Sequence, residues 1–179
     1  MKPLYLTPVA AIIIYLGTIL QFPLPGTDIP QTGQTIAVLF AGAVLGRLYG
    51  PMAVGLYLLA GAVGLPVYSD SGSGLENLFG DSAGYFFGFL TGAMLMGHLS
   101  AIGLTSKGLP CFLSLLLGHA VILFFGFAWL ARSNGIITAY NTGVEPFYIG
   151  SLAKSLITTF LIMGFNGLTR DSKSLSRLN

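Results

Sequence analysis

Residues 34–65 read QTIAVLFAGAVLGRLYGPMAVGLYLLAGAVGL, two apolar segments separated only by Arg47-Leu48-Tyr49-Gly50. Each segment, 34–48 and 51–65, is short for a helix that must cross about 30 Å of hydrocarbon. We therefore expect the pair to form a tight helical hairpin. Its ends need not reach full membrane depth, because irregular backbone is tolerated where it is buried in protein or lines a cavity.

Four further apolar segments flank this hairpin, at 4–22, 83–102, 109–131 and 147–168. Apolar residues make up 54% of the chain and charged residues 8%, and the mean hydropathy is +0.80. Soluble domains carry roughly 25% charged residues, so this composition excludes that class. The sequence predicts an all-α membrane protein: a single domain, 1–179, with six transmembrane helices in one compact bundle and a polar cytoplasmic tail at 170–179.

The charged residues alternate in sign from one connection to the next. Basic residues occupy one set of gaps, at Lys2, Arg47, Lys107, Arg170, Lys173 and Arg177. Acidic residues occupy the other set, at Asp28, Asp70, Glu76, Asp81 and Glu145. Short loops rich in Lys and Arg stay on the cytoplasmic side, so both termini are expected there. Arg132 and Lys154 are the two basic residues that this orientation does not explain.

The chain lacks the residues that several classes of function need. Cys111 is the only cysteine, which excludes an intrachain disulfide and offers no metal-ligand set. A net charge of +2 is too small to indicate nucleic acid. The chain has neither a zinc-type His-Glu-x-x-His nor an ATP-binding Gly-x-x-x-x-Gly-Lys-Ser/Thr. We therefore expect no enzyme, metal or cofactor, and uphill transport would need partner proteins or a gradient.

Two segments carry glycines four residues apart, Gly42, Gly46 and Gly50 in one and Gly84, Gly88 and Gly92 in the other. Small residues at this spacing let helix backbones approach closely, so both series are interpreted as packing faces and not as ligand contacts.

Lys154 lies about two turns inside the last apolar segment. A cation within a span is costly and usually faces the bundle interior or a wet cavity, which makes it a candidate ligand contact. Ser151, one turn earlier, would share its face. The remaining residues of this predicted substrate site are Gln34, Thr35, Tyr68, Gly72, Asn77 and Tyr85. The alternative is a Lys154 that extends to the interface or pairs with Glu145.

Two histidines lie inside predicted helices, His98 and His119. Intramembrane histidines take part in some proton relays. Neither has a carboxylate partner within its helix, so hydrogen-bonded core histidines are the preferred interpretation. Arg132 is expected to pair with an acid of an outer loop.

Four motifs occur in the order and spacing of one known family: PQTGQTIAVLFAG at 30–42, GAVGLPVY at 61–68, GDSAGY at 80–85 and PFYIGSLAK at 146–154. Together they cover nearly the whole chain. They resemble the BioY family, the biotin-specific substrate-binding subunits of energy-coupling factor (ECF) transporters. The resemblance implies capture of biotin from outside the cell, between the last three helices and beneath the first and third loops.

Three positions depart from the family pattern. Ser151 replaces the usual Asp, Gly72 or Ser71 stands where an amide would help to read a ureido ring, and the Gly-Pro-Thr/Ser element is Gly80-Asp81-Ser82. Dethiobiotin or lipoate, which also carry a carboxylate, therefore stay open as substrates.

The resemblance also implies partners and a location. Family members work in the cell membrane of prokaryotes with a membrane coupling subunit and two cytoplasmic ATPases. An Ala-x-x-x-Ala face on the first helix contacts the coupling subunit, and here Thr7 and Ala11 have that spacing. The alternatives are a channel or gradient-driven carrier that works alone, and an assembly or scaffold protein without a ligand pocket.

Overall fold

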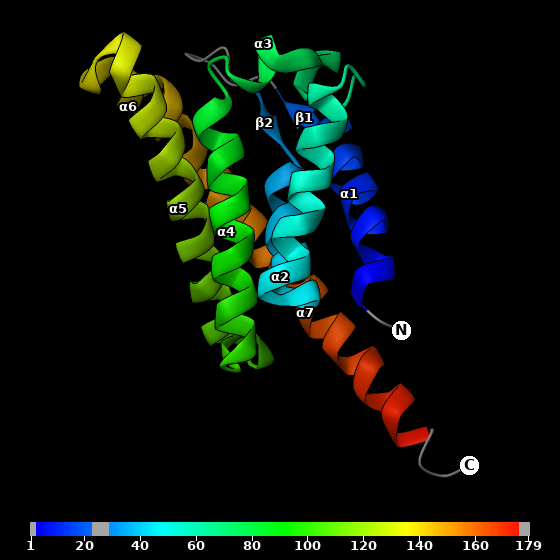
Figure 1. Ribbon diagram of the computed structural model, residues 1–179. Coiled ribbons are helices and arrows are strands. Elements are labelled where there is room, and N and C mark those ends of the chain that lie inside the picture. The colour runs from blue at the N-terminus through cyan, green and yellow to red at the C-terminus, as the bar shows by residue number, and fades with distance from the viewer. Residues whose placement is uncertain (1–2, 23–28, 176–179) are drawn as a thin grey trace.

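The computed structural model describes residues 3–22 and 29–175, which form a bundle of helices with their long axes roughly aligned (Figure 1). The long helices are α1 (Pro3–Ile19), α2 (Gln34–Ala62), α4 (Ala83–Ala101), α5 (Gly108–Asn134) and α7 (Tyr148–Leu175). Shorter elements connect them: β1 (Gln21–Phe22), β2 (Gln31–Thr32), η1 (Ser69–Ser71), α3 (Gly74–Leu78), η2 (Leu104–Ser106), α6 (Ile136–Gly143) and η3 (Glu145–Phe147). The all-α expectation is confirmed apart from the two-residue strands, which pair antiparallel.

Helix α2 folds back on itself at Gly46, where φ is +82° and ψ is −177°. We call residues 34–45 its first arm and residues 47–62 its second arm. The arms lie side by side, because the Gln34 amide donates to the Tyr57 hydroxyl at 2.5 Å across 23 positions of sequence. Figure 1 shows the two arms running in opposite directions. The predicted hairpin is confirmed, with its turn at Gly46, just before the expected 47–50, because this backbone conformation is essentially restricted to glycine.

The glycine series are packing faces, as predicted, at every position except Gly46. A Cβ on Gly42 would strike the backbone of Ala93 in α4, and one on Gly88 would lie 2.8 Å from the Cα of Ile122 in α5. Gly50, Gly84 and Gly92 are similarly close to neighbouring residues. At Gly46 a Cβ would meet nothing within 4 Å, so this glycine serves the turn and not a helix contact.

The ends of two helices differ from the approximate spans that the sequence predicts. The first helix ends at Ile19, before residue 22, because Gln21 and Phe22 pair with β2. Helix α7 continues to Leu175, through most of the expected polar tail, since no Gly or Pro follows Gly167 to stop it. The expectations for Lys2, Asp28 and Arg177 lie outside the described residues, and the side chains of Arg170 and Lys173 are likewise not described.

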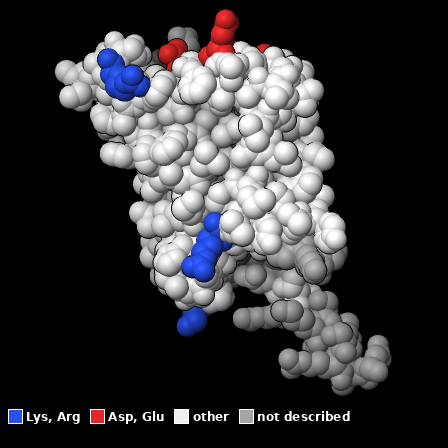
Figure 2. All heavy atoms as spheres, viewed as in Figure 1, with Lys and Arg blue, Asp and Glu red and all other residues white. Residues whose placement is uncertain are grey.

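The chain has the helices of a multi-pass membrane protein. Among the described residues, three stretches are long and apolar enough to cross a membrane: Gln34–Ala62, Gly108–Asn134 and Ile136–Thr169. The first of these is the folded α2, so its 29 residues form two short antiparallel arms. Figure 2 shows the described acidic side chains at the α3 end of the bundle and basic side chains at the opposite end, with one basic group at the acidic end.

One face of α1 packs against α2, and the other carries exposed apolar side chains. Ile14 is fully buried, and Thr7 and Ala11 are buried on the same face. Thr7 and Ala11, the predicted partner face, therefore lie on the buried side of α1 in this structure. Exposed residues on α1 include Tyr5 and Ile12.

Candidate functional site

Lys154 lies in α7 with its ammonium group turned toward the interior of the bundle. Its Nζ donates a hydrogen bond of 2.9 Å to the backbone carbonyl of Thr32 in β2, 122 positions away in sequence. Glu145, the alternative partner, is exposed on η3. Lys154 thus bonds to an interior carbonyl instead of forming the Glu145 pair, and it brings α7 against the β1–β2 ribbon.

Gln34 opens the first arm of α2 beside this lysine. Its amide nitrogen donates to the Tyr57 hydroxyl, and its carbonyl oxygen accepts from the Thr32 hydroxyl at 3.1 Å. Gln34 is 3% exposed, so both ends of its side chain amide are satisfied within the protein. Thr32 therefore links Gln34, through its side chain, to Lys154, through its backbone.

His119 occupies the middle of α5 within a hydrogen-bonded group. Its Nδ1 lies 3.0 Å from both the Leu115 carbonyl and the Ser155 hydroxyl, and its Nε2 lies 3.3 Å from the Thr35 hydroxyl. The interpretation as a hydrogen-bonded core histidine is confirmed for His119. It is wrong for His98, which is exposed near the end of α4.

Tyr85, in the first turn of α4, spans the bundle toward α6. Its hydroxyl donates to the backbone carbonyl of Gly143 at 2.6 Å, and its ring lies 6.1 Å from that of Phe147. The ring fills the space beside Gly126, where a Cβ would collide with it. Tyr85 therefore holds the short α6–η3 segment close to α4.

These side chains border one cavity of about 60 Å³. Five of the eight predicted site residues line it: Gln34, Thr35, Tyr85, Ser151 and Lys154. Aromatic and aliphatic side chains form much of its wall, chiefly Phe86, Phe89, Ile122, Leu123 and Phe147, and Thr32, Ser82 and His119 add polar groups. Ile29, Pro30 and Ser69 also line it, from the segments at the acidic end of the bundle. A cation, hydroxyls, an amide and apolar walls together suit a small molecule with polar and apolar parts.

The other three predicted site residues do not line this cavity. Tyr68 is 3% exposed and donates to the Leu58 carbonyl at 2.6 Å, with its ring against Gly61 and Phe86. Burial raises the pKa of Tyr68, which favours its neutral hydrogen-bonding form. Its role here is to pack behind Phe86, which does line the cavity.

Gly72 and Asn77 lie in the connection between α2 and α4. Gly72 closes the η1 turn, where its carbonyl accepts from the Tyr68 backbone N–H at 3.0 Å. Asn77 is exposed, and its amide donates to the Ser73 carbonyl at 2.7 Å. The two residues are also neighbours, since a Cβ added to Gly72 would lie 3.1 Å from Asn77 Oδ1. Both therefore stabilise the loop itself.

Sequence reasoning missed the apolar wall and the carbonyl of Thr32. Phe86 and Phe89 face the cavity, whereas Phe87 between them is 54% exposed. No sequence signal separates the three, because all occur in a uniformly apolar helix. The motif at 30–42 contains Thr32, but a backbone acceptor has no side-chain signature.

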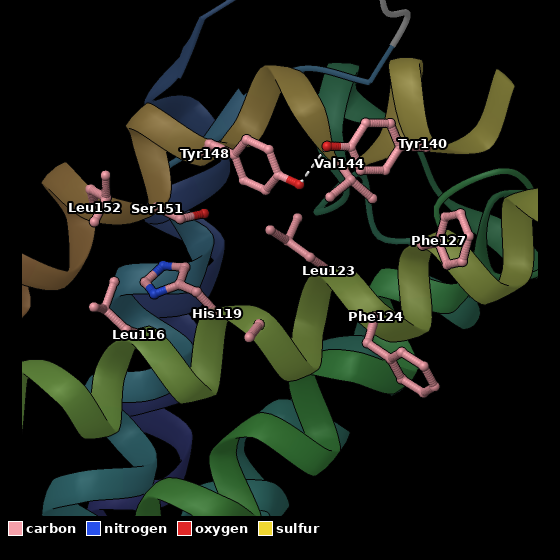
Figure 3. Close-up of a pocket in the computed structure, with 11 residues that line it drawn as sticks. Leu116, His119, Leu123, Phe124, Phe127, Tyr140, Val144, Tyr148, Ser151 and Leu152 are labelled. Atoms are coloured by element: carbon pink, nitrogen blue, oxygen red, sulfur yellow. Dashed lines mark hydrogen bonds between the residues drawn. The ribbon is translucent and has the colours of Figure 1, made fainter. Parts of the chain in front are cut away.

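A larger groove of about 510 Å³ lies beside the cavity, between α5, α6 and α7 (Figure 3). His119, Leu123 and Ser151 line both spaces, so they form the partition between them. At the α6 side of the groove, the Tyr148 hydroxyl donates to that of Tyr140 at 2.9 Å, which Figure 3 shows as a dashed line.

Within the described residues, no group of three or more His, Cys, Asp and Glu side chains is arranged to hold a metal ion. Arg132 lies with its guanidinium carbon 4.6 Å from the centre of the Trp129 ring, and no acid among the described residues pairs with it as expected.

A bundle of membrane helices that encloses a lysine, an amide and hydroxyls within apolar walls defines a membrane-embedded binding protein for a small molecule. The match to known proteins is more specific than this class. The chain belongs to the BioY family, whose model matches residues 1–171.

Relatives and a solved structure agree with this membership. The chain is 34% identical over 160 residues to "Biotin transporter BioY" of Rhizobium etli, covering 85% of this chain and 86% of that one. It is 33% identical over 165 residues to the protein of the same name from Thermotoga maritima, covering 90% and 84%. A crystal structure of "the S-component for biotin from an ECF-type ABC transporter" superposes with a TM-score of 0.83 at 25% identity, covering 93% of this chain and 91% of that one.

Proposed function

We propose that this protein is the substrate-binding subunit of an ECF-type biotin transporter, with the cavity around Lys154 as its binding site. The observation that carries the proposal is the position of Lys154, the one lysine inside the bundle among the described residues, within a fold shared with a biotin S-component. Its ammonium group would donate to an oxygen of the ligand. Phe86, Phe89 and Ile122 would contact the apolar part.

Biotin needs more space than the 60 Å³ cavity provides, since pockets for small molecules usually measure about 300–1,000 Å³. Two neighbouring features would supply it. The ribbon that carries Thr32 forms one wall, attached to α7 through the Lys154 bond. The partition of His119, Leu123 and Ser151 separates the cavity from the 510 Å³ groove. We propose that ligand entry breaks the Lys154–Thr32 bond and displaces one of these walls.

Isothermal calorimetry with the purified protein in detergent tests the substrate. Biotin is expected to bind with a saturable heat at one site per chain. Ser151 lines the cavity with a short hydroxyl, so the calorimetry also compares biotin with lipoate, which lacks the ureido ring. If biotin gives no heat while dethiobiotin or lipoate does, the proposed substrate is wrong, although the binding role stands.

The same proposal includes the arrangement in the membrane. We propose six crossings, by α1, the two arms of α2, α4, α5 and α7, in the plasma membrane of a prokaryote with both termini in the cytoplasm. The separation of charge supports this orientation. Asp70 and Glu76 belong to η1 and α3, whereas Arg47 lies at the turn of α2 and Lys107 just before α5. Figure 2 shows acidic side chains at the α3 end and basic side chains at the other end.

We further propose that uptake depends on a membrane coupling subunit and two cytoplasmic ATPases, since the chain lacks its own ATP-binding motif. In this structure such a subunit would meet the exposed apolar face of α1, which includes Tyr5 and Ile12, and not the buried Thr7 and Ala11.

Uptake of labelled biotin tests this dependence. Cells that express the chain without any coupling or ATPase subunits are expected to accumulate no biotin above the medium concentration, and co-expression of the subunits should restore accumulation. Accumulation by the chain alone, abolished by an uncoupler, would instead identify a gradient-driven carrier.

A further inference from the structure

A second apolar groove, of about 640 Å³, lies on the opposite side of α4 and α5 from the site described above. The second arm of α2, the first half of α4 and the end of α5 form it. We call it the α2–α4–α5 groove. The lining residues used below are Gly55, Leu59, Phe87, Phe125, Trp129 and Arg132. It shares only Phe86 with the cavity around Lys154, so it is a separate feature.

The groove runs along the bundle from its middle to its acidic end. Gly55 and Phe125 lie near the middle of the bundle, and the second arm of α2 and α5 both proceed from there toward the acidic end. The α4 residues that line it extend from Ala83 to Leu90, which at 1.5 Å per residue is about 10 Å. Leu59 and Phe87 are 64% and 54% exposed, so the groove faces the surroundings of the bundle. An apolar groove that is open to the surroundings can hold a hydrocarbon chain.

A fixed cation stands at the acidic end of this groove. The Arg132 guanidinium lies over the Trp129 ring at 4.6 Å, and Trp129 is itself anchored by a 3.0 Å hydrogen bond from its indole N–H to the Gly80 carbonyl. Asp70, Glu76, Asp81 and Glu145 belong to the same end of the bundle. Among the described residues Arg132 pairs with none of them and remains exposed, with its hydrogen-bond donors available to another anion.

From this arrangement we infer that the α2–α4–α5 groove binds an anionic phospholipid. One acyl chain lies between the walls of the groove, and Arg132 attracts the net negative charge of the headgroup, whose phosphate accepts its hydrogen bonds at the level of Trp129. An arginine and a tryptophan at the end of an apolar channel match the two parts of such a lipid, because aromatic rings prefer the headgroup level and guanidinium groups bind phosphate in a forked geometry. The inference does not depend on biotin as the substrate.

Trp129 is the only tryptophan in the chain, so its fluorescence reports this groove directly. The protein is reconstituted in nanodiscs in which phosphatidylglycerol or phosphatidylcholine, brominated on the acyl chain near the headgroup, replaces the unlabelled lipid stepwise. Bromine quenches a tryptophan that it contacts. We expect phosphatidylglycerol to bind about fivefold more tightly than phosphatidylcholine, as one basic residue near a membrane surface implies. Arg132→Gln should bring this ratio close to one.

Two glycine variants test the apolar part of the groove. Neither Gly55, inside it, nor Gly164, on the exposed side of α7, has any atom within 4 Å of an added Cβ. Gly55→Leu should fill the groove and reduce quenching by both lipids, whereas Gly164→Leu should leave it unchanged. Thermal melting establishes that both variants fold.

Three outcomes would overturn the inference. Wild-type protein could show equal affinity for the two lipids, or Arg132→Gln could keep the fivefold preference. Gly55→Leu could also leave quenching unchanged while it converts a dimer into a monomer in light scattering, which would assign the groove to a second copy of the chain.

Discussion

Lys154→Ala is expected to weaken biotin binding by about 10- to 100-fold, the largest effect of any single side chain in the site. A hydrogen bond from a charged donor contributes about 1.5–3 kcal/mol, which corresponds to that range of Kd. Lys154 is the one cation on the cavity wall, and removing it also releases the Thr32 carbonyl. The change in Kd is measured by calorimetry.

Two further variants separate charge from packing. Lys154→Met keeps an apolar side chain of similar length and should lose nearly as much affinity as the alanine variant. Lys107→Ala removes an exposed basic residue at the other end of the bundle and should bind normally. If Lys154→Ala binds within twofold of wild type while biotin still gives a saturable heat, the cavity around Lys154 is not the binding site.

Gly42→Ala is expected to destabilise the bundle by about 2–3 kcal/mol, because the added methyl group meets backbone and not a movable side chain. Its Cβ would lie 2.9 Å from the Ala93 Cα, against about 3.5–4.0 Å for a favourable carbon contact, and still closer to the Ala93 carbonyl oxygen. The first arm of α2 and helix α4 would have to move apart. Thermal unfolding in detergent measures the loss.

Gly55→Ala is the matched control within the same helix. At Gly55 an added Cβ meets nothing within 4 Å, and alanine is the better helix former by about 1 kcal/mol. This variant should therefore melt at the wild-type temperature or slightly above it. Equal melting temperatures for the two variants would show that the close approach of α2 and α4 contributes little to stability.

The hairpin in α2 could be predicted because its signals are local. Two short apolar segments around Arg47 exclude a single long crossing, and the structure reverses the chain one residue earlier, at Gly46. The series Gly84, Gly88 and Gly92 was equally readable, since a spacing of four places small residues on one helix face. Gly42, Gly46 and Gly50 instead span the turn of α2. By contrast, the termini of α1 and α7 were predicted less well, because hydropathy marks where a helix is apolar and not where it ends.

The candidate site was predictable only where a polar residue stands out in an apolar helix. Lys154 was found in this way, together with Ser151 one turn before it, and both line one cavity with Gln34, Thr35 and Tyr85. The same reasoning failed in the connection between α2 and α4, where polar residues are ordinary. There Asn77 bonds to the local backbone and Tyr68 turns into the core, because loops satisfy their own polar groups first.

In the site proposed above, the bond between Lys154 and the Thr32 carbonyl would make substrate loading an exchange of acceptors. An incoming substrate oxygen would replace the carbonyl, so the ammonium group would keep a hydrogen-bond acceptor throughout loading. The same exchange run backwards assists unloading, since Thr32 returns as the substrate leaves and no bare ammonium group is left in an apolar interior. A transport protein must release its substrate as well as bind it, and the Thr32 carbonyl, by competing with the substrate for Lys154, would assist both steps.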